Sequence, residues 1–343
     1  MENFVELTND QRREMINTRQ RFQALRQAET RARGYRGSMV WEKTKGYEYL
    51  IRAFYENDTG RRRQKSLGRR TAATEGIKKT FDAERSDAQE EQENLKALMV
   101  RQAAINSVLG LGRVPLMAAK ILRNLETSGL LGSGLRVVGT NALYAYEAAC
   151  GVFLDPGMTT TEDIDLLFDA RRHLRLVGEK PESGTVFLDL LQRADTSFKR
   201  LNNTFRAQNR DGYLVDVIKP LRNTPWKPEG SLSSDEKDLE AVAIKGLVWL
   251  ENAPGFEHVV IDEKGNPLRM VAVDPRVFAI HKHWLSKRID RDPLQRGRDL
   301  AQAKAVFALV RNHLQHLPLE ADEFKMMPKE IVAKAFTDLT AGK

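Results

Sequence analysis

The sequence has a single cysteine, Cys150, among its 343 residues. One cysteine excludes a disulfide bond within the chain and is typical of a protein from a reducing compartment. Because Cys150 lies in an apolar stretch with a helical pattern, we expect it to be a small buried side chain rather than a nucleophile.

Long apolar runs are absent as well. No stretch approaches the roughly 20 apolar residues that a membrane-spanning helix needs. The first residues, MENFVELTND, lack the basic and then apolar pattern of a signal peptide. We therefore expect no membrane partner and a cytoplasmic location.

Charged residues, in contrast, are plentiful and unevenly distributed. The composition, 41% hydrophobic and 30% charged, suits a globular protein, and the length favours two or three domains. The net charge of +8 is confined to the first 70 residues, which hold 17 Lys and Arg against 9 Asp and Glu. A local excess of positive charge favours a polyanionic partner such as a nucleic acid, although arginine-rich faces are often merely solvated.

The first 70 residues predict a helix followed by a small antiparallel sheet. Residues 9–32 form a polar, arginine-rich helix with Asn9 or Asp10 as its N-cap. Alternating side chains then predict three strands joined by turns at 45–46 and 57–60. These strands cover residues 39–45, 47–55 and 61–67.

This sheet is open to two interpretations. It resembles the small arm-type DNA-binding domains of phage integrases, and in that case residues 61–65, Arg69 and Arg70 contact phosphates. Alternatively, it is a small sheet that packs on the rest of the protein, with a basic edge that prevents aggregation. The sequence favours neither interpretation.

Two helices are predicted between this sheet and the centre of the chain. Residues 72–108 form a long, highly charged helix that begins near Thr71 and connects the two parts. Its middle, residues 84–93, is too polar to belong to a core. Pro115 then begins another helix, which ends near Gly129.

Two carboxylates share one face of a strand in the centre of the chain. A short apolar strand at 135–138 leads into Gly139-Thr140-Asn141 and a helix at 143–153, and a second strand carries Asp163-Ile164-Asp165. Residues two apart in a strand point to the same side, so Asp163 and Asp165 face the same way. Adjacent carboxylates repel each other unless a cation lies between them. Mg²⁺ or Mn²⁺, which bind hard oxygen ligands together with phosphates, would supply that cation.

A third carboxylate interrupts a later apolar strand. Asp216 lies between Val215 and Val217, after a hairpin turn at 210–212 that follows a strand at 203–208. A buried carboxylate without a partner costs free energy, so a partner is expected. If this strand neighbours the strand of the other two acids, the three carboxylates converge. Such a cluster can hold two metal ions, one at the attacking oxygen and one at a triphosphate.

Together these features resemble the nucleotidyltransferase fold of the DNA polymerase β superfamily. The shared pattern is a strand, a Gly-Ser or Gly-Thr turn that opens a helix, an Asp-x-Asp strand and a later strand with one Asp. The resemblance implies that Asp163, Asp165 and Asp216 are the catalytic metal ligands, and that Asp216 assists deprotonation of the attacking hydroxyl.

The resemblance also assigns a role to the turn before the helix. It implies that Gly139 and Thr140, with Asn141 beside them, bind the triphosphate of an NTP through backbone amides and a hydroxyl group. Most members of the superfamily carry Gly-Gly or Gly-Ser here, and the compact members have a shorter gap to the paired acids. The resemblance therefore rests mainly on the acids.

A second resemblance involves two helices near the C-terminus. Residues 273–285 predict a helix that contains Lys282, and a later helix contains Arg298 and Asp299. This order is similar to that of bacterial abortive-infection toxin nucleotidyltransferases, in which a helical lysine and a later Arg-Asp pair follow the metal site. The similarity implies that Lys282 reaches the triphosphate, and that Arg298 with Asp299 braces the site or contacts the nucleotide.

The sequence therefore predicts an α+β protein with a polymerase β-like nucleotidyltransferase core, in which helices flank a mixed sheet. A basic helix and sheet precede this core, and a helical part follows it. The expected divisions are a basic arm, a connecting helix, the catalytic core, and a part with a β-hairpin and helices that completes the nucleotide site. They cover residues 1–70, 71–110, 111–230 and 231–343.

The predicted activity is metal-dependent transfer of a nucleoside monophosphate from an NTP to a hydroxyl acceptor. The basic residues 1–70 favour RNA, including tRNA, as the acceptor, and a protein side chain is a further alternative. Two other functions are compatible with the sequence. One is a nucleic-acid-binding protein with a vestigial transferase core, against which the three acids argue. The other is the toxin of a toxin–antitoxin pair, with the antitoxin as its partner.

Overall fold

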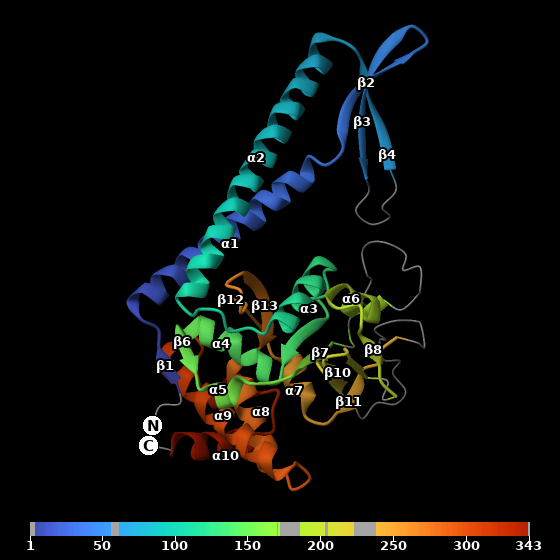
Figure 1. The fold of residues 1–343 in the computed structure, drawn as a ribbon. Coiled ribbons are helices and arrows are strands. Elements are labelled where there is room, and N and C mark those ends of the chain that lie inside the picture. Colours follow the sequence, from blue (N-terminus) through green and yellow to red (C-terminus); the bar gives the residue numbers. More distant parts are fainter. Residues whose placement is uncertain are drawn as a thin grey trace.

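The computed structural model describes residues 4–55, 62–169, 171, 186–202, 205–222 and 238–341. It combines helices with a mixed sheet, as the α+β prediction requires, and a long helical arm projects from the body of the protein (Figure 1). Within the described residues, none of the helices combines the length and the apolar character needed to cross a membrane. The turn expected at 57–60, Arg61 and the first residues of the strand expected at 203–208 lie outside the described ranges.

One eight-stranded mixed sheet forms the centre of the body. Its strand order is β12-β13-β5-β7-β10-β9-β8, and β11 pairs with β10. The hairpin of β12 and β13 joins the sheet through parallel pairing of β13 with β5, so strands from both sides of the expected division at residue 230 share one sheet. The strands are β5 (Leu135–Val138), β7 (Asp163–Phe168), β8 (Lys199–Arg200), β9 (Arg206–Gln208), β10 (Leu214–Pro220), β11 (Val242–Ile244), β12 (Gly255–Ile261) and β13 (Pro267–Val273).

The central strands are apolar because helices bury them. Leu135, Ile164 and Val215 are fully buried in a core that also takes side chains from the helices of the body. Three of these helices gather at the end of the body opposite the arm (Figure 1): α8 (Pro275–Ser286), α9 (Pro293–His313) and α10 (Lys329–Thr340). The other helical segments are α3 (Leu116–Thr127), η1 (Thr140–Ala142), α4 (Leu143–Cys150), α5 (Pro156–Thr159), α6 (Val186–Ala194), α7 (Leu247–Asn252) and η2 (Ala321–Phe324).

The helix expected at 143–153 is shorter than predicted. It ends at Cys150 because Gly151 adopts the left-handed conformation, with φ of 66°. The following residues form β6 (Val152–Leu154), which pairs with the N-terminal strand β1 (Phe4–Glu6). Cys150 is buried, and burial raises the pKa of its thiol to about 12, so the thiolate that a nucleophile needs is disfavoured.

The arm consists of two long helices and a sheet at their far end (Figure 1). Helices α1 (Asn9–Gly34) and α2 (Ala72–Val108) run in opposite directions, and the sheet comprises β2 (Ser38–Thr44), β3 (Tyr47–Tyr55) and β4 (Arg62–Arg69). The N-cap of α1 is Thr8, which exchanges hydrogen bonds with Gln11, so neither Asn9 nor Asp10 is the cap. The turn between β2 and β3 is formed as expected by Lys45 and Gly46, both with positive φ.

Helix α2 packs along α1 rather than crossing solvent alone. Ala88 is fully buried in its middle, and Arg31 of α1 pairs with Glu84 and Glu91 at 2.8 and 2.9 Å. The segment predicted to be too polar for a core is therefore half of a helix pair, in which ion pairs border a small apolar contact.

Buried polar groups fix the base of the arm to the body. The hydroxyl of Thr18 donates to Asn106 Oδ1 at 2.9 Å, and Asn106 Nδ2 donates to the carbonyl of Gly265 at 2.9 Å. Gly265 lies in the turn between β12 and β13, where a Cβ atom would come within 2.0 Å of the carbonyl oxygen of Ala103. Only glycine permits this close approach of α2 to the sheet.

Candidate active site

The pairing of β7 with β10 brings three carboxylates to one face of the sheet. The two strands are parallel neighbours, and Asp216 lies directly opposite Asp165, while Leu214 lies opposite Asp163. Directly opposed residues of paired strands point to the same side, and Asp163 is two residues from Asp165. The neighbouring strands expected from the sequence are therefore present, and all three acids share a face.

Asp165 is the electrostatic centre of this group. Burial, followed by the negative charges of Asp163 and Asp216, raises the pKa of Asp165 to about 7. The positive charges of Lys282 and Arg206 act in the opposite direction. Three acids and two cations are thus close enough to influence one carboxyl group.

Asp216 has a partner that the sequence did not reveal. Arg206, opposite Asp216 on the antiparallel strand β9, places Nε and Nη2 at 2.6 and 2.5 Å from the two carboxylate oxygens. This bidentate geometry is the strongest form of arginine–carboxylate pairing. The hydrogen bond to Asp216 is the main cause that raises the pKa of Arg206, and the charge of Asp216 adds to it.

This ion pair bears on the metal-binding role that the sequence predicts for the three acids. In the part of the chain that the structure describes, no three His, Cys, Asp or Glu side chains are arranged to hold a metal ion. The three acids share a face, and Arg206 holds both oxygens of Asp216. Their role as metal ligands therefore stays a prediction. Their hard carboxylate oxygens still suit Mg²⁺ or Mn²⁺ chemically, and Asp163 and Asp165 are not tied to arginine in this way.

The predicted phosphate-binding turn lies against the acids. Gly139 has φ of 63°, and a Cβ atom there would come within 2.1 Å of Asp165 Oδ2, so any side chain would strain the turn and displace this carboxylate. Asn141 Nδ2 donates to the carbonyl of Asp163 at 2.7 Å, which ties the turn to β7. Asn141 Oδ1 is buried, and no described residue donates a hydrogen bond to it.

A glutamine links α9 to this turn, and no pattern in the sequence singles it out. Gln302 Nε2 donates to Thr140 Oγ1 at 3.3 Å and to the carbonyl of Met158 at 2.9 Å. Gln302 is fully buried, so its amide holds Thr140 in a fixed position relative to α9.

Lys282 and Asp299 form a buried pair between α8 and α9. Lys282 Nζ lies 2.7 Å from Asp299 Oδ1, and Arg291 Nε lies 2.9 Å from the other oxygen of Asp299. The charge of Lys282 also offsets part of the rise in the pKa of Asp165, so the lysine lies within electrostatic range of the acids. The structure thus brings Lys282 and Asp299 together at the side of the carboxylate face.

Arg298 lies elsewhere on the same helix. Its Nη2 donates to the carbonyl of Thr160 and, at 3.4 Å, to that of Met158. It therefore holds the segment that leads into β7. Among the described contacts of Arg298, none is with the three carboxylates, which is compatible with a bracing role.

Two further aromatic groups are buried nearby. Burial, and then the charge of Asp163, raises the pKa of Tyr213, and no described residue pairs with its hydroxyl. Burial, and then the charge of Lys282, lowers the pKa of His281 to about 3, so this imidazole is neutral. His281 packs against Trp249 and Trp284, in agreement with a structural role.

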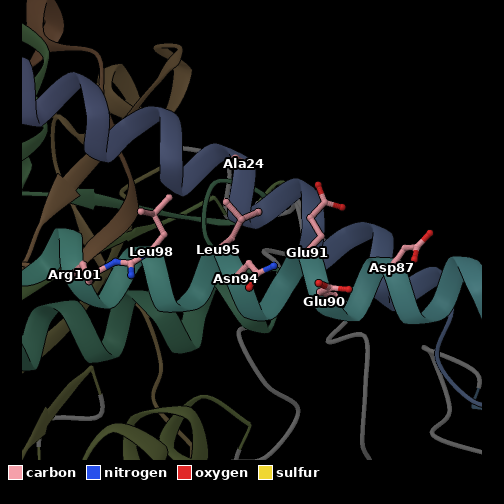
Figure 2. Close-up of a pocket in the computed structure, with 8 residues that line it drawn as sticks. All are labelled: Ala24, Asp87, Glu90, Glu91, Asn94, Leu95, Leu98 and Arg101. Carbon is pink, nitrogen blue, oxygen red and sulfur yellow. The ribbon is translucent and has the colours of Figure 1, made fainter.

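The basic arm lies apart from the acids. The sheet with Arg62, Lys65 and Arg69 stands at the far end of α1 and α2, not on the body (Figure 1). A groove of about 640 Å³ is also on the arm rather than at the carboxylates. Figure 2 shows Leu95 and Leu98 of α2 in this groove, directed toward α1.

Comparison with known proteins identifies a family for the body of the protein. Residues 117–327 fit the model of a protein family described as nucleotidyltransferase. The matched range spans more than half of the chain and includes the three acids, the Gly139 turn and Lys282. No curated protein and no solved structure matches the chain. The arm lies outside the matched range.

Proposed function

Because the chain belongs to the nucleotidyltransferase family, we propose that it moves a nucleoside monophosphate from an NTP to a hydroxyl acceptor, with Mg²⁺ or Mn²⁺ as cofactor. The observation that carries the proposal is the alignment of Asp163, Asp165 and Asp216 on one face of the sheet, beside the turn at Gly139. In the reaction, the acceptor oxygen bonds to the α-phosphorus, the bond to pyrophosphate breaks, and the acceptor proton goes to a base.

The three acids have separate roles in this proposal. Asp163 and Asp165 would be the main metal ligands, and Asp216 would join them and accept the proton of the attacking hydroxyl. A divalent cation at these oxygens would neutralise phosphate charge and lower the pKa of the attacking hydroxyl. Asp216 can act in this way only after Arg206 releases at least one of the two carboxylate oxygens of Asp216.

The nucleotide would lie between the turn and α8. The backbone amides that follow Gly139 and the hydroxyl of Thr140 suit phosphate oxygens. Lys282, a compact charge on a flexible side chain, would contact the triphosphate, with Asp299 holding it in place. Asn141 and Arg298 would support the turn and the segment before β7 through the carbonyl contacts that they make.

The finer classification belongs to the same proposal. The order of β5, the Gly139 turn, β7 and β10 supports membership of the DNA polymerase β superfamily, and the pair of Lys282 and Asp299 supports a relationship to the bacterial abortive-infection toxin type. The arm supports RNA, including tRNA, as the acceptor because it holds the excess positive charge of the chain. A protein acceptor, an antitoxin partner and a vestigial core that only binds nucleic acid are the competing proposals. The buried single cysteine suits the cytoplasm, which we propose as the compartment.

The decisive experiment offers the protein each labelled NTP with Mg²⁺ and total RNA or cell lysate. The proposal requires label in a macromolecular fraction with the wild type, and its loss with EDTA and with Asp165→Asn. Label in RNA would assign an RNA acceptor, and label in protein would assign a protein acceptor. Absence of metal-dependent NTP turnover under all conditions would favour the vestigial core.

A further inference from the structure

The three-stranded sheet of the arm has one covered face. Leu50 of β3 is fully buried, and the guanidinium of Arg52 lies over the ring of Phe81 on α2, 4.4 Å from its centre. Arg70 pairs with Glu48 of β3 and with Glu75 of α2 at 2.9 and 2.7 Å. This face, with the even-numbered residues of β3, is therefore packed on α2.

The other face carries a row of tyrosines. Tyr47, Tyr49 and Tyr55 occupy odd positions of β3, so their side chains project from the side opposite Leu50. Tyr47 and Tyr55 are 54% and 63% exposed, values that are unusual for large aromatic rings. Val40, opposite Ile51 on β2, is 44% exposed on the same face.

Arginines lie among these tyrosines. The guanidinium of Arg69 lies over the ring of Tyr47, 4.1 Å from its centre, and Arg69 Nε donates to the hydroxyl of Tyr49 at 3.1 Å. Arg62 lies opposite Tyr55 in the pairing of β3 with β4. Glu42 is also on this face, opposite Tyr49. The face therefore has two arginines and one glutamate, and its net charge is positive.

We propose that this open face, defined by Tyr47, Tyr49, Tyr55, Arg62 and Arg69, binds single-stranded RNA by stacking of the bases. Exposed rings offer flat surfaces to unpaired bases of any sequence, and neighbouring arginines contact phosphates and stack on bases. A duplex keeps its base faces stacked inside and cannot use the tyrosines. The proposal deepens the proposed function, since it rests on an RNA acceptor and defines its form.

Arg69 and Arg70, which are neighbours in the sequence, lie on opposite faces of the sheet. Arg70 takes part in the contact with α2 and holds the sheet in place, whereas Arg69 is on the open face with its ring partners. RNA binding by this face therefore depends on the aromatic rings and on the positive charges. The contribution of the charges weakens as the salt concentration rises, whereas that of the rings does not.

The test measures fluorescence anisotropy of a labelled 15-nucleotide oligo(A) RNA, alone and in a duplex with oligo(U), in EDTA without NTP. The stacking variant is the double substitution Tyr47→Ser and Tyr55→Ser. Its matched control is Val100→Ser, which removes an exposed apolar side chain from α2, 72% exposed in the wild type. Because the two tyrosines are exposed, both variants should unfold at wild-type temperatures, as circular dichroism would show.

We expect the tyrosine variant to bind single-stranded RNA at least about fivefold more weakly for each ring removed, with an unchanged salt slope, while the control binds like the wild type. The wild type should prefer the single strand to the duplex. Equal affinity of the tyrosine variant, or preference for the duplex, overturns the proposal. Binding of neither RNA also overturns it and leaves the face to a protein partner.

The same measurement separates this inference from the proposed transfer. Asp165→Asn should bind RNA like the wild type, because the acids lie on the body and not on the arm. RNA binding by the wild type without nucleotidyl transfer would support RNA binding by the open face and would contradict the proposed activity. Transfer to RNA by the wild type, together with unchanged RNA binding by the tyrosine variant, would support the proposed activity and contradict RNA binding by the open face.

Discussion

Arg206 holds both oxygens of Asp216 from the neighbouring strand, at 2.6 and 2.5 Å. The guanidinium thus stands where a cation at the third acid would also have to bind. If the proposed divalent cation binds at these acids, Arg206 competes with it for Asp216. The side chain of Arg206 is 33% exposed, so it has room to move toward solvent.

Arg206→Gln should therefore strengthen Mn²⁺ binding several-fold in the absence of NTP, because Asp216 loses its competing cation. The electron paramagnetic resonance signal of free Mn²⁺ in a titration measures this affinity. Without metal, the free energy of unfolding should fall by about 2 kcal/mol, since Asp216 is left without its ion pair and Arg206 is only partly buried. Arg210→Gln, in the exposed turn before β10, is the control. Unchanged or weaker Mn²⁺ binding would show that Arg206 positions Asp216 for the metal instead.

Asp165→Asn should abolish metal-dependent transfer and leave the fold intact. Burial and two neighbouring carboxylates disfavour the charged form of Asp165, as its pKa of about 7 indicates. The amide removes this repulsion, so the midpoint of urea unfolding in EDTA should be equal to or higher than that of the wild type. Asp211→Asn in the exposed turn controls for the loss of one charge. Wild-type turnover by Asp165→Asn would contradict the assignment of the acids.

Gly139→Ala tests the contact between the turn and the acids. The added Cβ would fall 2.1 Å from Asp165 Oδ2, at a backbone conformation that alanine rarely adopts. We expect activity to fall by roughly 100-fold or more and the protein to lose about 2 kcal/mol of stability. Gly297→Ala, on α9 with no atom near its Cβ position, should gain up to about 1 kcal/mol and retain activity. Equal activity of both variants would place the reaction elsewhere.

Lys282→Ala should raise the KM for NTP or lower kcat, without a change in acceptor preference. Asp299 retains Arg291 as a partner, so we expect a loss of about 2 kcal/mol in stability rather than unfolding. Steady-state kinetics with two acceptors measure both effects. Lys304→Ala, an exposed lysine of α9, is the control. A change confined to acceptor preference would remove Lys282 from the nucleotide site.

Neutral residues in the basic part of the arm should flatten the salt dependence of RNA binding. Each lost phosphate contact reduces the slope of log K against log salt by about 0.7 for a single strand. Turnover with a small acceptor should survive, because the acids are on the body. An unchanged slope would mean that the arm is structural. The set comprises Arg61, which lies outside the described residues, and Arg62, Arg63, Lys65, Arg69 and Arg70.

Arg70→Gln, made alone, separates the two kinds of arginine in that set. Because Arg70 pairs with Glu48 and Glu75, its replacement should loosen the sheet on α2 rather than remove a phosphate contact. A lower unfolding temperature with an unchanged slope is the expected result. A reduced slope of log K against log salt, with unchanged stability, would show that Arg70 contacts RNA phosphates.

Local signals accounted for much of the fold. Asp274 with Pro275 and Asp292 with Pro293 begin α8 and α9, because a capping carboxylate and a first-turn proline act within a few residues. The start of α2 at Thr71 follows from the same chemistry. The predicted end of a helix was wrong where a single residue determined it. The left-handed conformation of Gly151 ends α4 before Phe153, the predicted last residue.

The site was less accessible to sequence reasoning than the fold. Strand alternation placed Asp163 and Asp165 on one face, but nothing local pairs Arg206 with Asp216 or Gln302 with Thr140. These contacts depend on which strands and helices become neighbours. An arginine directly across a tight hairpin from a lone buried acid was the available signal for Arg206, and it becomes informative only once β9 and β10 are known to pair.

The pairing of β1 with β6 has a practical consequence for dissecting the protein. Residues ahead of the arm supply a strand to the body, so removal of everything before α2 would also expose an edge of β6. The arm sheet is instead an insertion between two antiparallel helices. Deletion of residues 36–70, with a loop of about four residues to join α1 to α2, would give a helical hairpin that keeps both β1 and the contacts of Asn106. Such a shortened chain would show whether the transferase operates without the sheet of its arm.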